Sequence, residues 1–256
     1  MEFSKIKEVL NDIAPLSTQE DWDNSGVQVC CGHVNVKKAL IALEINNEVI
    51  DEAIKNKVEL IIAHHPMLFD PIKSICPCDH KGAYIIKLIK NNISVFSLHT
   101  PYDKVKGGLN DYFLEKLGLK NIKQVSDFAR VGNLPTKTKL ETLAKKVAKF
   151  TDCEGMVRVF GDPKKEVKKV GIVCGGGSEF YTEAMEAGAD VFITGDVRHH
   201  LAWNAKEEGM CMIDALHWGT EKFFVDDMYD MLNKKIGKEV KLIKSKVNQN
   251  AIDFMA

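Results

Sequence analysis

Hydrophobic residues follow two patterns along the chain. Phe3, Ile6, Leu10 and Ile13 recur at helical spacing, which predicts an opening amphipathic helix that Pro15 ends. Further along, short continuous apolar runs alternate with helical segments of about ten residues. The runs that we interpret as strands buried on both faces are 39–43, 59–63, 93–98, 170–173, 191–193 and 211–213. This alternation is typical of an α/β fold with a mostly parallel sheet.

The middle of the chain breaks this rhythm. Residues 121–167 predict a strand at 128–134, a helix at 140–150 and a strand at 156–160, followed by a turn at 161–163. The helices of the regular part are expected at 46–57, 82–90, 108–117, 179–187, 200–208 and 220–233. We therefore expect two α/β halves with mostly parallel sheets, residues 1–120 and 168–256, joined by a short α+β segment at 121–167.

Composition places the protein among ordinary globular proteins. Of its 256 residues, 45% are hydrophobic and 28% are charged, which excludes disordered and fibrous classes. No stretch approaches the roughly 18 apolar residues of a membrane span, and the first residues lack the hydrophobic core of a signal peptide. We expect a cytoplasmic protein that does not bind membranes. The net charge of −1 gives no general electrostatic reason to bind nucleic acid.

Basic residues are nevertheless concentrated in one segment. Residues 121–170 contain 12 Lys/Arg and 6 Asp/Glu. A basic surface that engages nucleic acid could be formed by Lys145, Lys146, Lys149, Lys164, Lys165, Lys168 and Lys169. A solvated helix face followed by a lysine-rich turn is the favoured interpretation, because the segment has few aromatic residues on which bases could stack.

The seven cysteines predict no disulfide framework. Their number is odd, two of them are adjacent, and their spacing is irregular. Cys76-Pro77-Cys78, followed by Asp79-His80, could contribute to a structural zinc site, but a single C-x-C is a weak signal. We expect reduced and mostly buried thiols.

Histidines cluster after the predicted strands. Six of the eight lie just downstream of such a strand: His64, His65, His99, His199, His200 and His217. The carboxyl ends of parallel strands are where open α/β sheets bind ligands. The adjacent pair ends the strand at 59–63 and is turned by Pro66, so that both imidazoles can face one crevice.

Two carboxylates accompany these histidines. Asp103 follows His99 closely, and Glu221 lies four residues after His217, which puts both side chains on one face if the segment is helical. Imidazoles and carboxylates together suit two transition-metal ions that share a carboxylate bridge. The sequence therefore predicts a metal site.

A glycine run follows the strand at 170–173. The amides of Gly175, Gly176 and Gly177 could bind a phosphate or another anion at the start of the next helix. The run matches neither the P-loop nor the dinucleotide-binding fingerprint, so a tight turn between strand and helix is the favoured alternative.

These motifs together resemble the NIF-three-like dinuclear-metal family, whose members are commonly named GTP cyclohydrolase 1 type 2. The motifs that carry the resemblance are His64-His65-Pro66-Met67-Leu68-Phe69, His99-Thr100-Pro101-Tyr102-Asp103, Gly195-Asp196-Val197-Arg198-His199-His200 and His217-Trp218-Gly219-Thr220-Glu221. Further similar stretches are Trp22-Asp23-Asn24-Ser25-Gly26, Gly107-Gly108-Leu109-Asn110-Asp111 and the glycine run. The resemblance covers nearly the whole chain. It departs from the family at Leu216, where a glycine commonly stands, and at Cys30-Cys31.

The resemblance implies a metal site in the crevice between the two halves. Its ligands would be His64, His65, Asp103, His217 and Glu221, with Glu221 as the bridge. It also implies a ring-shaped homohexamer assembled as a trimer of dimers. The chain looks like the compact form of the family, because only the short middle segment stands where other members carry an inserted domain.

The family name implies a reaction: GTP and water give formate and dihydroneopterin triphosphate. His99, His199 and His200 are then candidates for general acid/base duty or for orienting the ligands. Two divalent ions are expected, and imidazole with carboxylate accommodates Zn, Mn, Fe, Co or Ni. The same residues suit a nucleotide phosphoesterase equally well. A third reading is a ring-shaped metal-binding scaffold that engages nucleic acid or proteins.

Overall fold

The computed structural model describes residues 1–32 and 35–252, and it divides the chain into two compact units. The first unit contains residues 1–105 and 224–249, and the second contains residues 106–223 and 250–252, as far as these ranges are described. These boundaries differ from the expected ones. The segment 121–167 forms no separate part, because its strands belong to the sheet of the second unit, and the chain returns to the first unit after Phe223.

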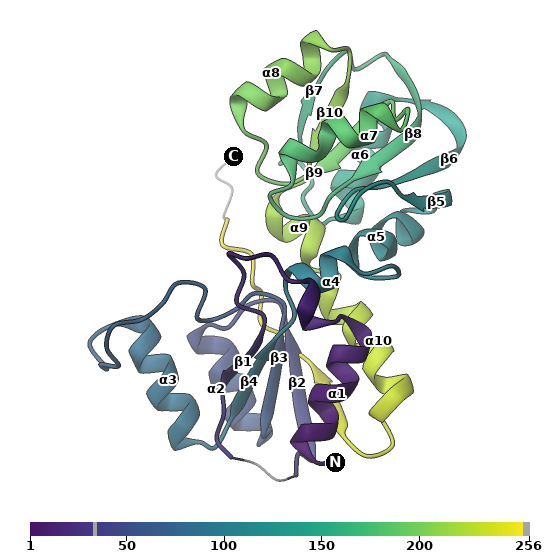
Figure 1. The fold of residues 1–256 in the computed structure, drawn as a ribbon. Coiled ribbons are helices and arrows are strands. Elements are labelled where there is room, and N and C mark those ends of the chain that lie inside the picture. Colours follow the sequence, from purple (N-terminus) through teal and green to yellow (C-terminus); the bar gives the residue numbers. More distant parts are fainter. Residues whose placement is uncertain (33–34, 253–256) are drawn as a thin grey trace. The chain divides into compact units, whose positions relative to one another are not determined.

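The first unit is a five-stranded sheet with helices on both faces (Figure 1). The strand order is β1-β4-β3-β2-β11, and three of the four pairings among these described strands are parallel. The elements of this unit are α1 (Phe3–Ile13), a 3-10 turn (Leu16–Thr18), β1 (Gly26–Val29), β2 (Lys38–Ala42), α2 (Asn47–Asn56), β3 (Leu60–Ala63), α3 (His80–Lys90), β4 (Ser94–Ser97), α4 (Thr100–Lys104), α10 (Phe224–Ile236) and β11 (Lys241–Lys244).

The core of the first unit explains its apolar strands. Leu40 of β2 and Ile61 of β3 pack with Val49 and Ile50 of α2 and with Leu88 of α3 on one face of the sheet. Helices α1 and α10 cover the other face (Figure 1). Every residue of β3 and β4 is buried, as expected of strands covered on both sides.

The second unit holds a six-stranded mixed sheet in the order β5-β6-β8-β9-β10-β7. Only the pairings β8-β9 and β9-β10 are parallel among the described strands, so this sheet is less parallel than expected. Its elements are α5 (Leu109–Leu117), β5 (Lys120–Gln124), β6 (Arg130–Lys139), α6 (Leu140–Phe150), β7 (Arg158–Phe160), β8 (Glu166–Ile172), a 3-10 turn (Ser178–Phe180), α7 (Tyr181–Glu186), β9 (Val191–Thr194), α8 (His199–Glu207), β10 (Cys211–Asp214) and α9 (His217–Glu221).

The α/β class with two sheets is confirmed, and most predicted elements lie within a few residues of the observed ones. The helix expected at 220–233 is two helices instead, α9 and α10, and the boundary between the units falls between them. Among the described residues, none of the helices combines the length and the apolar character that crossing a membrane requires.

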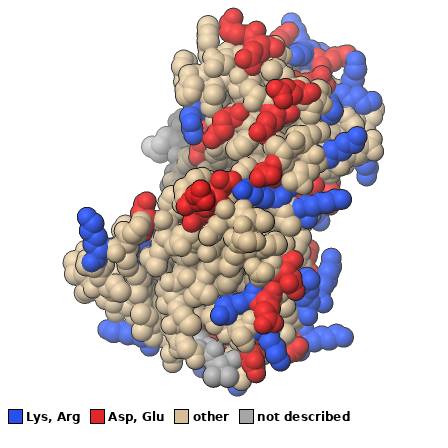
Figure 2. Space-filling model, in the orientation of Figure 1, with Lys and Arg blue, Asp and Glu red and all other residues tan. Residues whose placement is uncertain are grey.

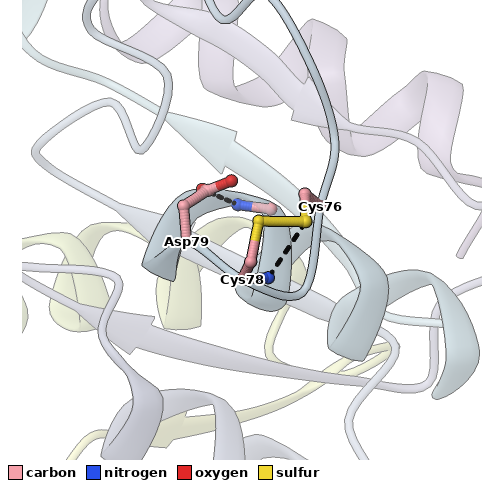
Figure 3. Close-up of a disulfide and its surroundings, with 4 residues drawn as sticks. Cys76, Cys78 and Asp79 are labelled. Carbon is pink, nitrogen blue, oxygen red and sulfur yellow. Dashed lines mark hydrogen bonds between the residues drawn. A yellow bond between two sulfur atoms is a disulfide. The ribbon is translucent and has the colours of Figure 1, made fainter.

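The prediction of reduced cysteines is wrong at one place. Cys76 and Cys78 form a disulfide in the loop before α3, where Asp79 caps the helix by accepting a hydrogen bond from the Gly82 amide (Figure 3). The other five cysteines are free thiols; Cys153, Cys174 and Cys211 are buried as expected, whereas Cys31 is half-buried and Cys30 is exposed. Sequence spacing alone did not reveal the disulfide, because two cysteines one residue apart can equally bind a metal.

The basic segment is partly explained by structural contacts. Lys146 donates to the carbonyl of Leu117 at the end of α5, and Lys169 donates to the carbonyl of Ala187 just after α7. Lysines in these positions satisfy carbonyl groups that the helices leave without an intrahelical donor. Figure 2 shows Lys and Arg side chains with Asp and Glu among them on this unit. The contacts favour a structural and solvated role for the segment.

Candidate metal centre

Three histidines of the first unit form one group. His64 and His65 follow β3, and His99 follows β4, its parallel neighbour in the sheet. Ligand atoms of the three imidazoles lie within 4.8 Å of one another. The structure thus brings together the histidines that the strand ends predict. The carboxyl ends of adjacent parallel strands meet at one edge, so residues 34 positions apart in the sequence become neighbours.

Backbone and side-chain acceptors fix the two adjacent imidazoles. Nδ1–H of His64 donates to the carbonyl oxygen of Leu98 at 2.8 Å, and Nδ1 of His65 lies 2.5 Å from Oε1 of Glu44. A carbonyl oxygen can only accept, so the neutral form of His64 carries its proton on Nδ1. In both rings Nε2 is therefore the atom that can ligate a metal. This is the arrangement that orients histidine ligands in metal sites.

Glu44, the partner of His65, was not among the residues that the sequence predicted for the site. It lies two residues beyond β2, the neighbour of β3 in the sheet. The histidines were predicted to lie together because they follow the carboxyl ends of neighbouring strands. The same argument, applied to carboxylates that follow strands, would have selected Glu44.

Asp103 belongs to the same edge of the sheet. It lies in the short helix α4, which begins directly after His99, and it is buried. Its Oδ1 is 3.7 Å from Nε2 of His64. Two ligands of one transition-metal ion, each at roughly 2.0–2.2 Å, lie no more than about 4.4 Å apart. The distance therefore allows both side chains to bind the same ion.

Asp23 orients the third histidine, a role that the motifs did not assign to it although it lies within the Trp22-Asp23-Asn24-Ser25-Gly26 stretch. Its Oδ1 lies 2.8 Å from Nδ1 of His99, and its Oδ2 accepts hydrogen bonds from the hydroxyl groups of Ser25 and Thr100. Burial on its own raises the pKa of Asp23, yet the hydrogen bonds from the imidazole and the two hydroxyl groups hold this pKa well below its ordinary value. Asp23 is therefore a buried, ionised anchor for the His99 ring.

The second unit carries the remaining candidate ligands on α9. Nε2 of His217 is 3.1 Å from Oε2 of Glu221, and Nδ1 is 2.8 Å from Oδ2 of Asp196 in the loop after β9. The charge of Glu221 raises the pKa of His217 to about 11, against the effect of burial and with the support of the Asp196 hydrogen bond. The hydrogen bond with His217 in turn lowers the pKa of Asp196. The imidazole is thus flanked by two carboxylates, and Asp196 orients it.

The glycine run packs against these ligands. Gly175 has a φ of 68°, and a Cβ atom there would overlap Oε1 of Glu221 and lie 3.3 Å from Nε2 of His217. Its amide donates to the Thr220 hydroxyl, and the amide of Gly177 donates to the Thr194 hydroxyl. Two of the three amides proposed for an anion are thus engaged within the protein. Anion binding at Gly175, Gly176 and Gly177 stays a prediction.

The last two candidate histidines lie on the surface of the second unit. His199 and His200 begin α8, and both are exposed. Their acid/base role stays a prediction as well.

Comparison with known proteins gives the family. A family model described as Duf34/NIF3 (NGG1p interacting factor 3) matches residues 1–251. A Clostridium perfringens protein named GTP cyclohydrolase 1 type 2 homolog is 34% identical over 262 residues, which cover 100% of each chain. The GTP cyclohydrolase 1 type 2 of Helicobacter pylori strain J99 is 32% identical over 226 residues, or 86% of this chain and 87% of the relative.

A solved structure agrees with these matches. The crystal structure of Staphylococcus aureus protein SA1388 superposes with a TM-score of 0.93 at 25% identity, covering 100% of this chain and 99% of that one. The similarity extends over the full length of both chains. The resemblance seen in the sequence motifs is confirmed, and the chain belongs to the Duf34/NIF3 family.

Proposed function

We propose that the protein is a metal-dependent hydrolase with a dinuclear centre held by His64, His65, Asp103, His217 and Glu221. The observation that carries this proposal is the fixed orientation of the imidazoles. Leu98 and Glu44 engage Nδ1 of His64 and His65, and Asp196 engages Nδ1 of His217. Each ring is thereby set to use Nε2 as the ligand atom.

The chemistry of the donor set fits divalent transition metals. Three imidazole nitrogens and two carboxylates match the ligands that Zn, Mn, Fe, Co and Ni accept. The absent side chain at Gly175 leaves room for the Glu221 carboxylate, which we propose as the shared ligand. Two bound ions would lower the pKa of water and polarise the bond under attack.

His99 is the best-placed residue for proton transfer. Asp23 engages its Nδ1, which leaves Nε2 to exchange a proton with a substrate or a water molecule. Its ring centroid is 5.3 Å from that of His64 and 5.4 Å from that of His65, so the exchange would take place beside the candidate ligands. The buried Asp23 carboxylate would keep the ring oriented during this exchange.

The names of the relatives suggest the reaction. Two of them are named GTP cyclohydrolase 1 type 2 or a homolog of it. We propose the corresponding reaction here, in which GTP and water give formate and dihydroneopterin triphosphate. Hydrolysis of a nucleotide phosphoester is the alternative that the same ligands support.

Metal analysis of variants tests the ligand assignment. His65→Ala and Glu221→Gln should each lower the metal bound per chain, whereas exposed His80→Ala and Glu207→Gln serve as matched controls. Because the two ligands come from different units, separate sites would let each variant keep about half of the metal. Wild-type metal content in either ligand variant would show that the assignment is wrong.

Formate release from GTP tests the reaction. The metal-reconstituted wild type should release formate, and Glu221→Gln should release none. Formate from neither protein, with any of the five metals, would reject the cyclohydrolase reaction while the metal analysis stands by itself. Phosphate release from a panel of nucleotides would then test the alternative.

The expected assembly is also part of the proposal. A ring-shaped homohexamer, built as a trimer of dimers, predicts a molar mass six times the 28.7 kDa of one chain in light scattering. The alternative of a scaffold that binds nucleic acid has weaker support, because Lys146 and Lys169 donate hydrogen bonds to carbonyl groups at the ends of helices.

A further inference from the structure

Two large aromatic side chains lie exposed beside the histidine group. Trp22 is 57% exposed and Phe69 is 45% exposed. Their ring centroids are 5.9 Å apart, and they lie 5.8 Å and 6.1 Å from the ring of His99. Large apolar side chains that form a solvent-exposed cluster mark binding surfaces more often than isolated exposed ones do.

Hydrogen bonds fix the chain next to each of these rings. The Gln28 side chain accepts from the Leu68 amide, and the Asn24 side chain donates to the Leu68 carbonyl. Both backbone polar groups of the residue before Phe69 are thus bound, one by β1 and the other by the loop that follows Trp22. The next residue of that loop, Asp23, is anchored to His99. Such fixation lowers the entropy that a ligand must overcome on binding.

The two rings are also inclined to each other. The planes of Trp22 and Phe69 make an angle of 52°, so the two rings are not stacked on each other. The plane of the His99 ring makes angles of 75° and 78° with the planes of Trp22 and Phe69. Aromatic faces attract flat π-systems, and an imidazole nitrogen at their side can hydrogen-bond to a polar edge. A planar heterocycle with polar edges has both features, whereas a sugar phosphate lacks the flat apolar face.

We propose that Trp22 and Phe69 bind the planar heterocyclic ring of the substrate and hold it next to His64, His65 and His99. This inference deepens the proposed function and rests on it for the location of the chemistry. It assigns substrate recognition to residues outside the candidate metal ligands, and it favours a substrate with a nucleobase-like ring over a simple phosphoester.

Calorimetric titration of metal-free protein with GTP and with tripolyphosphate tests the inference. GTP should bind more tightly than tripolyphosphate to the wild type. Trp22→Ala and Phe69→Ala should each weaken GTP binding by about 10-fold or more, since the loss of one stacking ring costs roughly 1–3 kcal/mol. Trp22→Phe, which keeps an aromatic face, should restore most of the affinity.

The control is an equally exposed tryptophan elsewhere. Trp203 on α8 is 56% exposed, so Trp203→Ala removes a comparable ring and should leave GTP binding unchanged. Wild-type GTP affinity in Trp22→Ala, equal affinity of the wild type for both ligands, or no GTP binding at all would each overturn the inference. A changed molar mass in Trp22→Ala with unaltered GTP affinity would also overturn it and assign the rings to a protein interface.

This experiment separates the inference from the proposed function. Binding to metal-free protein does not depend on the ligand assignment or on catalysis. Base-dependent GTP binding without formate release would reject the reaction and retain the aromatic site. Formate release that Trp22→Ala leaves at the wild-type rate, at GTP concentrations below KM, would reject the aromatic site and retain the reaction.

Discussion

Oδ1 of Asp23 lies 2.8 Å from Nδ1 of His99, although 76 residues separate the two in the chain. Asp23 is buried, and it also accepts hydrogen bonds from Ser25, Thr100 and the amide of Asn24. One carboxylate therefore joins the loop before β1 to the start of α4. Orientation of His99 and stability of the first unit depend on the same group.

Asp23→Asn should destabilise the protein at neutral pH by about 2–4 kcal/mol, because the amide cannot replace all the hydrogen bonds of a buried carboxylate. The folded-state pKa of Asp23 is lowered, so its stabilising contribution is present above the unfolded-state pKa of about 3.9 and is lost as the pH falls through the folded-state value. Urea denaturation in the presence of EDTA at pH 7 and pH 3.5 measures both effects.

The matched control for this experiment is Asp21→Asn. Asp21 is exposed, two residues away in the same loop. It should unfold like the wild type at both pH values. An equal difference in unfolding free energy between wild type and Asp23→Asn at pH 7 and at pH 3.5 would show that Asp23 is not held ionised by its neighbours.

Gly175 is expected to be required for the metal site more than for folding. Gly175→Ala places a Cβ atom against Glu221 at a backbone φ of 68°. Gly209→Ala introduces a side chain at a φ of 79° with nothing within 4 Å of the new atom. Both variants should lose about 1 kcal/mol of folding stability, because a left-handed conformation disfavours a side chain. Only Gly175→Ala should lower the bound metal, as measured by elemental analysis. Equal metal content in the two variants would contradict this role of Gly175.

Much of the candidate site could be predicted from the sequence, because parallel strands end at one edge. His64, His65 and His99 needed only the strand positions and the α/β class to be placed together. The strand positions do not select Asp23, since it lies in a loop and contacts His99, which is 76 positions away in the sequence. The Trp22–Gly26 stretch contains Asp23 but does not show which residue it contacts. No periodic pattern marks such a residue.

In the fold as well, elements with a clear local sequence pattern were predicted, whereas features that depend on distant contacts were not. Strand β11 has lysines at both ends and lies at the edge of its sheet, so its sequence lacks the apolar run of a central strand. The return of the chain to the first unit after Phe223 depends on the pairing of β11 with β2. The boundaries expected at 120 and 168 assumed that each half is one continuous stretch of sequence. In the structure the first unit combines two stretches, because β11 pairs with β2.

The disulfide between Cys76 and Cys78 predicts a defined change in thiol reactivity. In the native protein, reduction should add two maleimide labels, because both residues lie in the loop before α3 and neither is buried. Cys211→Ser should show the same increase, since Cys211 is buried and outside the disulfide. Mass spectrometry of the intact protein counts the labels. An unchanged number after reduction would show that the two thiols are not joined.

Glu44 should control metal affinity without being a ligand. Its carboxylate lies 2.5 Å from Nδ1 of His65, and partners of this kind orient a histidine ligand and increase its basicity. Glu44→Gln can still hydrogen-bond but carries no charge, so the metal affinity should fall by about 10–100-fold with folding stability nearly unchanged. Glu48→Gln, at an exposed position in the first turn of α2, is the matched control and should bind metal like the wild type. Competition with a chromogenic chelator measures the affinity. A wild-type value for Glu44→Gln would mean that the backbone alone sets the direction of His65, and the orientation argument would then hold only for His64 and His217.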